Sequence, residues 1–518
     1  MESGFFPTFS TVFWLDFERD FIEKRAMADD NTPAHKAGES VPLPEWDALN
    51  RRRFLFQLGS GIGSVALSSL LAREQAVASE SLGINPVINP LVPKLPHFPG
   101  RAKSCIFLMM EGGPSQMDTF DPKPKLKEMA GKLFERKDKL KSNQNGGERY
   151  LTASPFQFQR YGQCGRDVSE LFPNVGACVD DLAFVRSVYA DSDNHPAALF
   201  QFLTGQAFQG SPSIGSWMVY GLGTENQNLP AFVVLRDGRP FGGTATWGNA
   251  YLPACYQGTQ LRSGAIPILD LQPPEDVSPQ RQRRNLDLLQ ILNRQYSQRN
   301  PAHPDLEARI ASYELAFRMQ AEVPETLSIE GEPESIRKLY GLDREKSKDF
   351  GSRCLLARRM VERGVRFVQL WSGDWDAHDN ILSHRTSADK VDLPIAGLIQ
   401  DLKQRGLLDE TLVVWGGEFG RTPDTNAGNH KKNRCGRDHN PSAMTMWFAG
   451  GGVGGGKLIG ATDELGYKVT EAPHHLRDVH ATLLHLFGLD QSKLTFYHAG
   501  RFKQLTDTGG TVIRDLLA

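Results

Sequence analysis

Short apolar stretches alternate with segments of helical periodicity along most of the chain, from about residue 104 to the C-terminus. The apolar stretches are nearly continuous runs of Val, Ile, Leu, Phe, Met and Trp, which is typical of strands buried on both faces of a sheet. The pattern predicts an α/β fold with a mostly parallel central sheet and helices on both faces. The expected strands are Ser104–Met110, Phe184–Tyr189, Ala231–Leu235, Val365–Trp371, Thr411–Trp415 and Ala443–Ala449.

Helices are expected between these strands. Two of them end at a glycine, Gly364 and Gly406, as helices commonly do. A polar region with helical periodicity, interrupted by the letters NPAHP, is expected to form a helical insertion on the main domain. The helical stretches are Asp349–Arg363, Leu393–Arg405 and Leu476–Phe487, and the insertion covers residues 285–320.

The N-terminal part of the chain predicts an export signal. The letters RRRFL at residues 51–55 fit the twin-arginine pattern, an apolar stretch follows them, and AVA at residues 76–78 fits a cleavage site. A short membrane anchor or a buried helix is the alternative, but the apolar run is rich in Gly and Ser and shorter than the ~20 residues that a span needs. We therefore expect an exported, periplasmic or extracytoplasmic protein with no transmembrane segment after cleavage. The expected divisions are 1–78 for the extension and signal peptide, 79–102 for a proline-rich linker and 103–518 for the main domain.

Charge and cysteine content narrow the possible functions. The chain has 59 Lys and Arg against 61 Asp and Glu, a formal net charge of −2, which argues against a nucleic-acid-binding protein. Its six cysteines form no CxxC pair, so a cysteine zinc ribbon is not expected.

Carboxylates and histidines follow several of the predicted strands. Ligands of open α/β sheets bind at the carboxyl ends of strands, so these side chains are expected to meet there. A site made of Asp374, His378 and His439 would have the two-histidine, one-carboxylate composition of a catalytic metal centre with an open coordination position. Asp376 and Asp379 would support it by accepting an imidazole N–H. The full set at strand ends is Glu111, Asn194-His195, Asp374, His378, Glu418 and His439.

Several of these motifs together resemble the bacterial family called DUF1501, within the alkaline phosphatase-like superfamily that also holds sulfatases. The resemblance begins near Lys103 and implies an alkaline phosphatase-like fold for residues 103–518. It also implies metal binding by Glu111, Asp374, His378, Glu418 and His439. Phe419 stands where the superfamily has another ligand. The motifs are EGGPSQMDTFDPKP, LFPNVG, NHPAALFQFLTG, GDWDAHDN, GGEFGRTP, GRDHNP and DVHATLLHLFGL.

The position of the superfamily's nucleophile is occupied differently in this chain. The resemblance places His195, preceded by Asn194, where phosphatases and sulfatases have Ser, Thr or a modified Cys. Sulfatase chemistry through a formylglycine is therefore not expected. His195 would act as a general acid or base, attack directly, or bind the metal. Arg421 and Arg437 would clamp a tetrahedral anion through paired N–H groups.

These expectations lead to one principal hypothesis and an alternative. The principal hypothesis is an exported hydrolase of phosphate or sulfate esters that uses one or two divalent ions, zinc first, with manganese, iron or calcium as alternatives. The alternative is a catalytically inactive metal- or anion-binding protein on the same fold. A redox role at a non-haem iron site is a third hypothesis, because the same ligand types bind iron.

Overall fold

The computed structural model describes residues 89–518 except 136–146, 237, 239, 263–270, 272, 274–275 and 300–304. The described residues belong to the unit Val87–Ala518, the second of two along the chain. The predicted signal peptide, residues 1–78, lies outside the described residues. From residue 89 the expected linker runs along the second unit, where Leu91 is buried and the backbone N–H groups of Arg101 and Ala102 donate to the Leu486 carbonyl.

The centre of the second unit is a mixed sheet whose strand order is β14-β5-β13-β9-β1-β8-β6-β7, with β17 beside β5. Neighbouring strands are parallel except β13, which runs antiparallel to both β5 and β9. The predicted α/β class with a mostly parallel sheet is confirmed. The strands are β1 (Ser104–Met110), β5 (Leu182–Tyr189), β6 (Phe232–Leu235), β7 (Thr259–Leu261), β8 (Phe367–Ser372), β9 (Thr411–Gly416), β13 (Met444–Ala449), β14 (Leu458–Ile459) and β17 (His474–His475).

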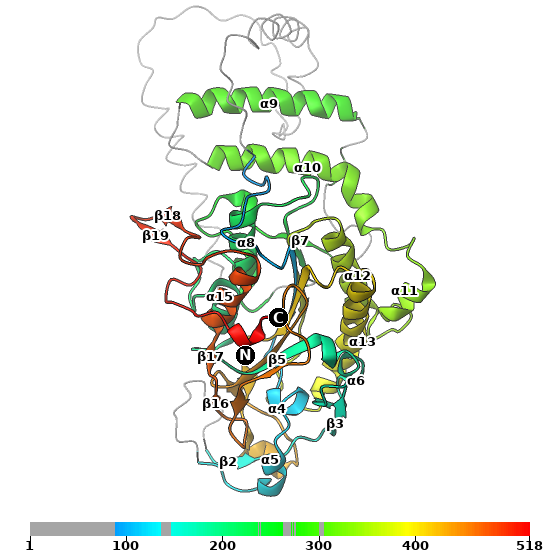
Figure 1. Ribbon diagram of the computed structural model, residues 1–518, viewed down its shortest axis with the longest axis vertical. Helices are drawn as coiled ribbons and strands as arrows, with labels where there is room; N and C mark the ends of the chain where they lie inside the picture. The colour runs from blue at the N-terminus through cyan, green and yellow to red at the C-terminus, as the bar shows by residue number, and fades with distance from the viewer. Residues whose placement is uncertain are drawn as a thin grey trace, which may run out of the picture. The chain divides into compact units, whose positions relative to one another are not determined.

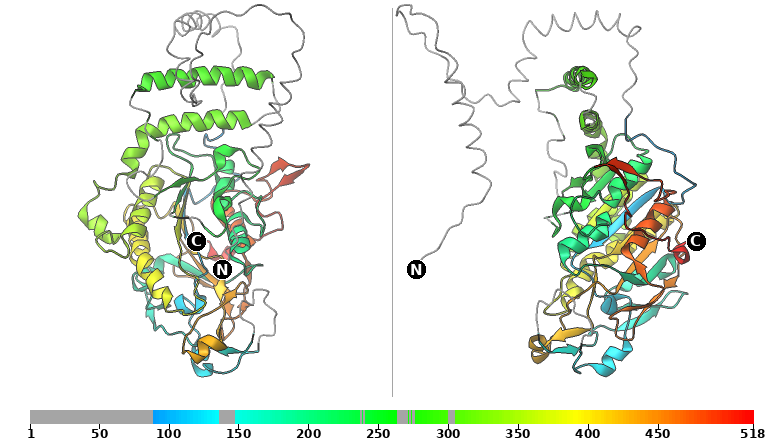
Figure 2. Two further views of the ribbon diagram at one scale, coloured as in Figure 1. Left: turned by 180° about the vertical axis from the view of Figure 1, so that it is seen from behind. Right: turned by 90° about the vertical axis from the view of Figure 1, so that its left-hand side faces the viewer.

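Helices cover both faces of this sheet (Figures 1 and 2). Alternate side chains of β1 divide between two hydrophobic cores, because successive residues of a strand point to opposite faces. Ile106 and Leu108 pack in the core that contains α12 and α13, whereas Cys105 and Phe107 pack in the core that contains α7, α8 and α15. The helices are α7 (His195–Thr204), α8 (Ile214–Leu222), α12 (Lys348–Glu362), α13 (Ser383–Gln404) and α15 (Leu476–Leu486).

The predicted helical insertion corresponds to two long helices, α9 (Pro279–Arg299) and α10 (Asp305–Leu327). Arg283 of α9 forms a two-pronged ion pair with Glu314 of α10, at 2.6 and 2.7 Å. The NPAHP letters between the helices, residues 300–304, lie outside the described residues. None of the described helices combines the length and apolar character needed to cross a membrane.

Smaller elements lie around the central sheet. The short helices are α4 (Gln116–Thr119), α5 (Pro124–Met129), α6 (Pro173–Gly176), α11 (Glu334–Leu339) and α14 (Ala427–Lys431). Five two-stranded pairs are also present in the described residues: β2 (Arg149–Leu151) with β11 (Asp424–Asn426), β3 (Phe158–Tyr161) with β4 (Arg166–Ser169), β10 (Gly420–Arg421) with β12 (His439–Asn440), β15 (Ala461–Thr462) with β16 (Val469–Glu471), and β18 (Phe496–His498) with β19 (Arg501–Lys503).

Two buried histidines make the stability of the fold sensitive to acid. Burial lowers the pKa of His384 to about 3 and that of His480 to about 4, so both rings are neutral in the folded protein. In the unfolded chain the same rings have pKa values near 6.5. Below pH 6.5 these rings therefore bind protons in the unfolded state but not in the folded state, and the free energy of unfolding decreases as the pH falls toward 4.

We expect the free energy of unfolding to fall by about 1.4 kcal/mol per pH unit for each of these rings between pH 6 and pH 4. His480→Gln keeps a donor for the Phe202 carbonyl, which the ring contacts at 2.7 Å, and removes the titration. Urea unfolding at several pH values should show a shallower pH dependence for this variant. Equal slopes in the two proteins would contradict the assignment.

Candidate metal centre

Three histidine rings converge on the carboxylate of Asp376. The Nε2 atoms of His378 and His439 lie 3.1 and 3.3 Å from Asp376 Oδ1. The Nε2 atom of His195 lies 3.5 Å from the other oxygen, Oδ2. The candidate ligand atoms of His195, Asp376 and His439 all lie within 4.8 Å of one another, and the Nε2 atoms of His378 and His439 are 3.0 Å apart.

Parallel strands bring these distant residues together. β8 and β9 flank β1, with Met109 level with both Trp371 and Gly416, so the loops that follow the three strands leave the sheet side by side. Asp376 and His378 lie in the loop after β8. The loop after β1 passes close beneath it at Gly112, whose φ is +113° and where a Cβ atom would lie 2.4 Å from the Asp376 nitrogen. Glycine is required at this crossing, because any side chain would separate the two loops.

His195 and His439 reach the same place from two other elements. His195 is the first residue of α7, and the side chain of Asn194 accepts a hydrogen bond from the Ala197 N–H as the helix cap. His439 lies in β12, where it pairs with Arg421 of β10. Asn194 thus positions the start of α7.

Each of the three rings has its second nitrogen next to an oxygen acceptor. Such contacts fix a ring's orientation and, in the neutral ring, place its hydrogen on Nδ1, which leaves a lone pair at Nε2 for a metal ion. The Nδ1 contacts are His195 to Glu418 Oε1 at 2.7 Å, His378 to Asp438 Oδ1 at 3.1 Å, and His439 to the Asp193 carbonyl at 2.6 Å.

The electrostatics of the cluster are dominated by Asp376. Burial alone would raise the pKa of Asp376, but hydrogen bonds to the three histidines and the charge of Arg421 hold it far below its usual range. Burial acts against the charged form of His195, yet hydrogen bonds to Asp376 and Glu418 outweigh it and raise the pKa of His195 to about 9. Burial lowers the pKa of His439. The charge of the ionised carboxylate is thus balanced by Arg421 and by protons on the rings, and a divalent ion bound to the rings would take the place of those protons.

The donor set fits a divalent ion. Three imidazole nitrogens and one carboxylate oxygen are ligands that zinc, manganese and iron all accept. The oxygen acceptors behind the rings are the outer contacts that metal-binding histidines usually have. His195 Nε2 is buried and faces Asp376 Oδ2 at 3.5 Å, which leaves both atoms directed at the same candidate ion position.

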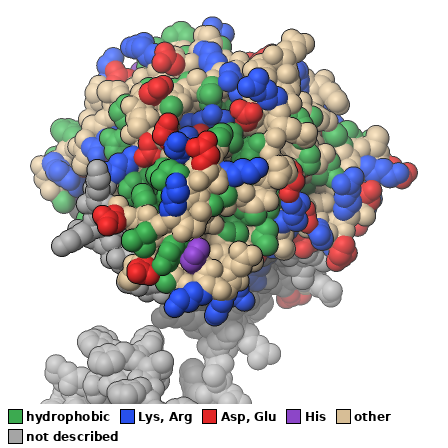
Figure 3. All heavy atoms as spheres, turned by 90° about the horizontal axis from the view of Figure 1, so that it is seen from below, with side chains coloured by type: hydrophobic (Ala, Val, Ile, Leu, Met, Phe, Trp, Pro, Cys, Tyr) green, Lys and Arg blue, Asp and Glu red, His purple; other side chains and the backbone are tan. Residues whose placement is uncertain are grey.

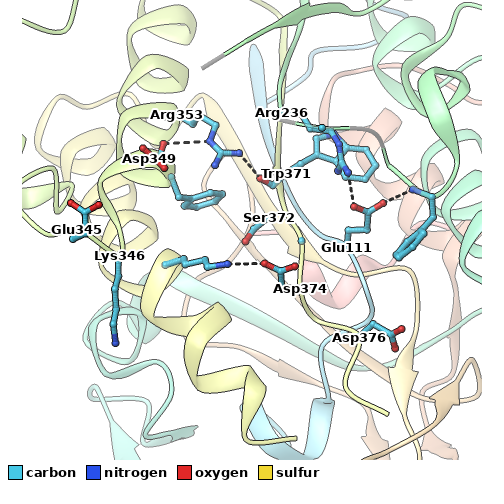
Figure 4. Close-up of a pocket in the computed structure, with 15 residues that line it drawn as sticks. Glu111, Arg236, Glu345, Lys346, Asp349, Arg353, Trp371, Ser372, Asp374 and Asp376 are labelled. Atoms are coloured by element: carbon cyan, nitrogen blue, oxygen red, sulfur yellow. Dashed lines mark hydrogen bonds and ion pairs between the residues drawn. The ribbon is translucent and has the colours of Figure 1, made fainter. Parts of the chain in front are cut away.

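A cavity of about 690 Å³ opens beside Asp376, between the strand ends and α12 and α13 (Figure 4). Glu111, Arg236 and Trp371 lie on the strand side, and Arg353 and Lys390 come from the helices. The Arg236 guanidinium donates to Glu111 at 2.8 Å and lies over the Trp371 ring. The cavity gives a solute access to the one ligand carboxylate that is partly exposed.

Glu111 lies beside the cluster rather than within it. Its carboxylate accepts hydrogen bonds from Arg236 and from the Phe241 N–H, both at 2.8 Å. Burial raises the pKa of Glu111 despite the nearby Arg236 charge. Phe241 stacks on His195 with ring centroids 4.6 Å apart, so Glu111 holds the segment that covers this histidine.

Asp374, which the sequence suggested as a ligand, lies apart from the histidines. Its side chain is 75% exposed and pairs with Lys390 at 2.7 Å. Its φ is +70°, unusual for a residue other than glycine, so the chain turns sharply there and directs Asp376 to the histidines instead. Asp379 is exposed.

The two predicted arginines differ in their surroundings. Arg421 is fully buried and donates to Asp376 Oδ1 at 2.7 Å and to the Gly113 carbonyl at 2.9 Å. Arg437 is fully buried and pairs with the equally buried Asp118 at 2.7 Å. Arg421 therefore holds the central carboxylate, whereas Arg437 joins two segments of the backbone framework.

Sequence reasoning overlooked two residues of the cluster's surroundings. Asp438, which precedes His439 in the GRDHNP motif, contacts His378, and Arg149 bridges Asp438 and Asp424. The position of Asp438 next to a candidate ligand was a usable signal. Arg149 follows a lysine-rich stretch and belongs to none of the motifs, so its partners could not be predicted.

Comparisons with known proteins agree with the sequence motifs. No curated protein matches the chain. Similar solved structures include the PsFucS1 sulfatase from Pseudoalteromonas sp. (TM-score 0.31, 12% identity, covering 75% of this chain and 68% of that one). Another is the phosphonate monoester hydrolase SpPMH from Silicibacter pomeroyi (TM-score 0.33, 12% identity, covering 79% of this chain and 76% of that one). A third is an alkaline phosphatase superfamily protein from Vibrio parahaemolyticus (TM-score 0.33, 9% identity, covering 80% of this chain and 73% of that one). The family model described as "Protein of unknown function (DUF1501)" matches residues 102–517, and the chain belongs to this family.

Proposed function

We propose that this protein is a metal-dependent hydrolase of phosphate or sulfate esters, with one divalent ion held by His195, Asp376, His378 and His439. The observation that carries the proposal is the convergence of three Nε2 atoms on one carboxylate, next to a cavity large enough for a small ester. Zinc is the proposed ion, because nitrogen-rich sets with one carboxylate suit it well.

The residues around the cluster would each contribute to hydrolysis. A bound divalent ion would act as a Lewis acid on the ester oxygen. Arg421 holds Asp376, and the carboxylate or carbonyl behind each ring keeps its Nε2 directed inward. Arg236, Arg353 and Lys390 line the cavity and would donate N–H groups to an anionic substrate. Arg236 and Lys390 would do so while paired with the Glu111 and Asp374 carboxylates.

His195 is assigned as a ligand rather than as the attacking group. Its Nε2 is buried and faces Asp376, and Phe241 and Phe419 lie 4.6 and 5.0 Å from its ring. A nucleophile or general acid must reach the substrate, which this packing prevents. Water is therefore the proposed nucleophile.

Export by the twin-arginine route and a periplasmic location remain part of the proposal. They rest on the letters RRRFL and the AVA site. On the face shown in Figure 3, basic and acidic side chains are interspersed, without the continuous basic surface of a nucleic-acid-binding protein.

A binding protein without catalytic activity is the second candidate. The observation that favours it is the aromatic packing of Phe241 and Phe419 around His195, where the superfamily resemblance implies a nucleophile. Such a protein would keep the ion and bind an anionic ester without cleaving it.

Metal analysis and substrate screening test the proposal. We expect one equivalent of divalent metal per chain by mass spectrometry after purification without chelators. Free metal at about 100 times its Kd should stabilise the apoprotein by about 2.7 kcal/mol. Phosphate and sulfate esters should be hydrolysed by the metal-loaded protein, and chelation should abolish the activity until metal is restored.

The outcomes separate the candidates. Metal binding without turnover of any ester would favour the binding protein. A protein that takes up no divalent ion even after reloading would contradict both.

A further inference from the structure

Glu418, which the sequence suggested as a metal ligand, has both carboxylate oxygens engaged by other groups. The residue is completely buried in the segment after β9. The Gly112 N–H donates to its two oxygens, at 2.9 and 3.1 Å, and His195 Nδ1 lies 2.7 Å from Oε1. In this arrangement the carboxylate is directed at a backbone amide and a ring nitrogen.

The ring of His195 is fixed by its neighbours as well as by Glu418. Phe241 stacks on one side of the ring, Phe419 lies 5.0 Å away, and the His439 ring makes an edge contact at 4.3 Å. Because the ring cannot turn, the location of its hydrogen determines whether Nε2 presents a lone pair or an N–H. If Nδ1 carries the hydrogen, Nε2 presents a lone pair toward Asp376.

We infer that Glu418 is a positioning residue that fixes the tautomer of His195 and so makes its Nε2 a metal-binding atom. The inference rests on the proposed metal site. A carboxylate accepts every N–H that reaches it, whereas an amide in its place would present an N–H of its own to either Gly112 or His195. Glu418 thus contributes to metal affinity without touching the ion.

The inference also explains why the site is proposed to hold a single ion. Glu418 is used by His195 and Gly112, and the Phe419 ring stacks on His439 at 4.3 Å. Neither residue of the Glu418-Phe419 pair is then available to bind a second ion.

Cobalt titration of the full chain tests this role, because Co²⁺ bound to nitrogen ligands has a visible spectrum that reports its coordination. We expect Glu418→Gln to bind Co²⁺ about 10–100-fold more weakly than the wild type, the usual loss for an outer partner of a ligand histidine. Its spectrum should also change, because one nitrogen ligand is weakened. Glu418→Asp keeps the negative charge on a side chain that is shorter by one methylene, so an intermediate loss of Co²⁺ affinity is expected. That variant carries the test if Glu418→Gln does not fold.

Asp392→Asn is the matched control. Asp392 is also a buried carboxylate, and it accepts the backbone N–H groups of Asn174 and Val175 at 3.0 and 2.8 Å, but it contacts no histidine in the described structure. Its loss should lower stability and leave the Co²⁺ affinity and spectrum unchanged.

The outcomes are distinct. Weaker binding confined to the Glu418 variants supports the inference. Wild-type affinity in Glu418→Gln, or an equal loss in Asp392→Asn, overturns it while the metal site stands. A wild-type protein that binds no Co²⁺ overturns the metal site itself, and the positioning role with it.

Discussion

Asp376→Asn is expected to weaken divalent-metal binding by more than about 100-fold, because outer partners of metal ligands already contribute about 10–100-fold. Asp376 is the one residue that all three histidine Nε2 atoms approach. The amide removes the negative charge that holds the ion and places Arg421, 2.7 Å away, beside a neutral group. Metal content after dialysis and the affinity from competition with a chromogenic chelator measure the effect.

Asp374→Asn is the control for this prediction. Asp374 precedes Asp376 by two residues in the same loop, lines the same cavity and also has a cationic partner, Lys390. Its side chain is directed away from the histidines, so its loss should leave the metal content at one equivalent per chain. Loss of metal in Asp374→Asn with retention in Asp376→Asn would reverse the assignment of the ligand.

Arg437→Gln is expected to lower the free energy of unfolding by about 3–5 kcal/mol, because it leaves the buried Asp118 carboxylate without its charged partner. Both side chains of this pair are fully buried. Arg437 also donates to the Thr152 and Thr422 carbonyls, at 3.1 and 3.2 Å, which would lose their donors. Urea unfolding gives the change directly.

Arg434→Gln is the control, since it removes the same charge three residues earlier from an exposed side chain. Its effect on stability should stay within about 0.5 kcal/mol. A stable Arg437→Gln protein with impaired binding of an anionic ester would contradict the structural role and restore the anion clamp.

The sheet was predictable because its strands are long apolar runs with few competing interpretations. All six expected strands are present, and the carboxyl ends of three of them deliver Glu111, Asp376 and Glu418 to one region. The antiparallel direction of β13 was not evident, because an apolar run carries no sign of its direction. The short edge strands β14 and β17 have too few residues to show a periodicity.

The side chains of the site were harder to predict than its location. GDWDAHDN contains three aspartates, of which Asp376 meets the histidines, whereas Asp374, at a positive φ, pairs with Lys390. Arg421 and Arg437 are the same type of residue in similar motifs, yet Arg421 pairs with Asp376 and Arg437 pairs with Asp118. Such pairings depend on contacts between segments 45 and 319 residues apart, which local sequence does not contain.

The place of β13 in the sheet sets an order of events during synthesis. β13 lies between β5 and β9, both of which precede it in the chain, so a gap remains in the sheet until residue 449 is available. His439 lies only a few residues before β13 and enters together with it. A nascent chain therefore lacks the complete proposed ligand set until β13 inserts, so an ion at the proposed site would be acquired by a nearly finished fold rather than by a growing one.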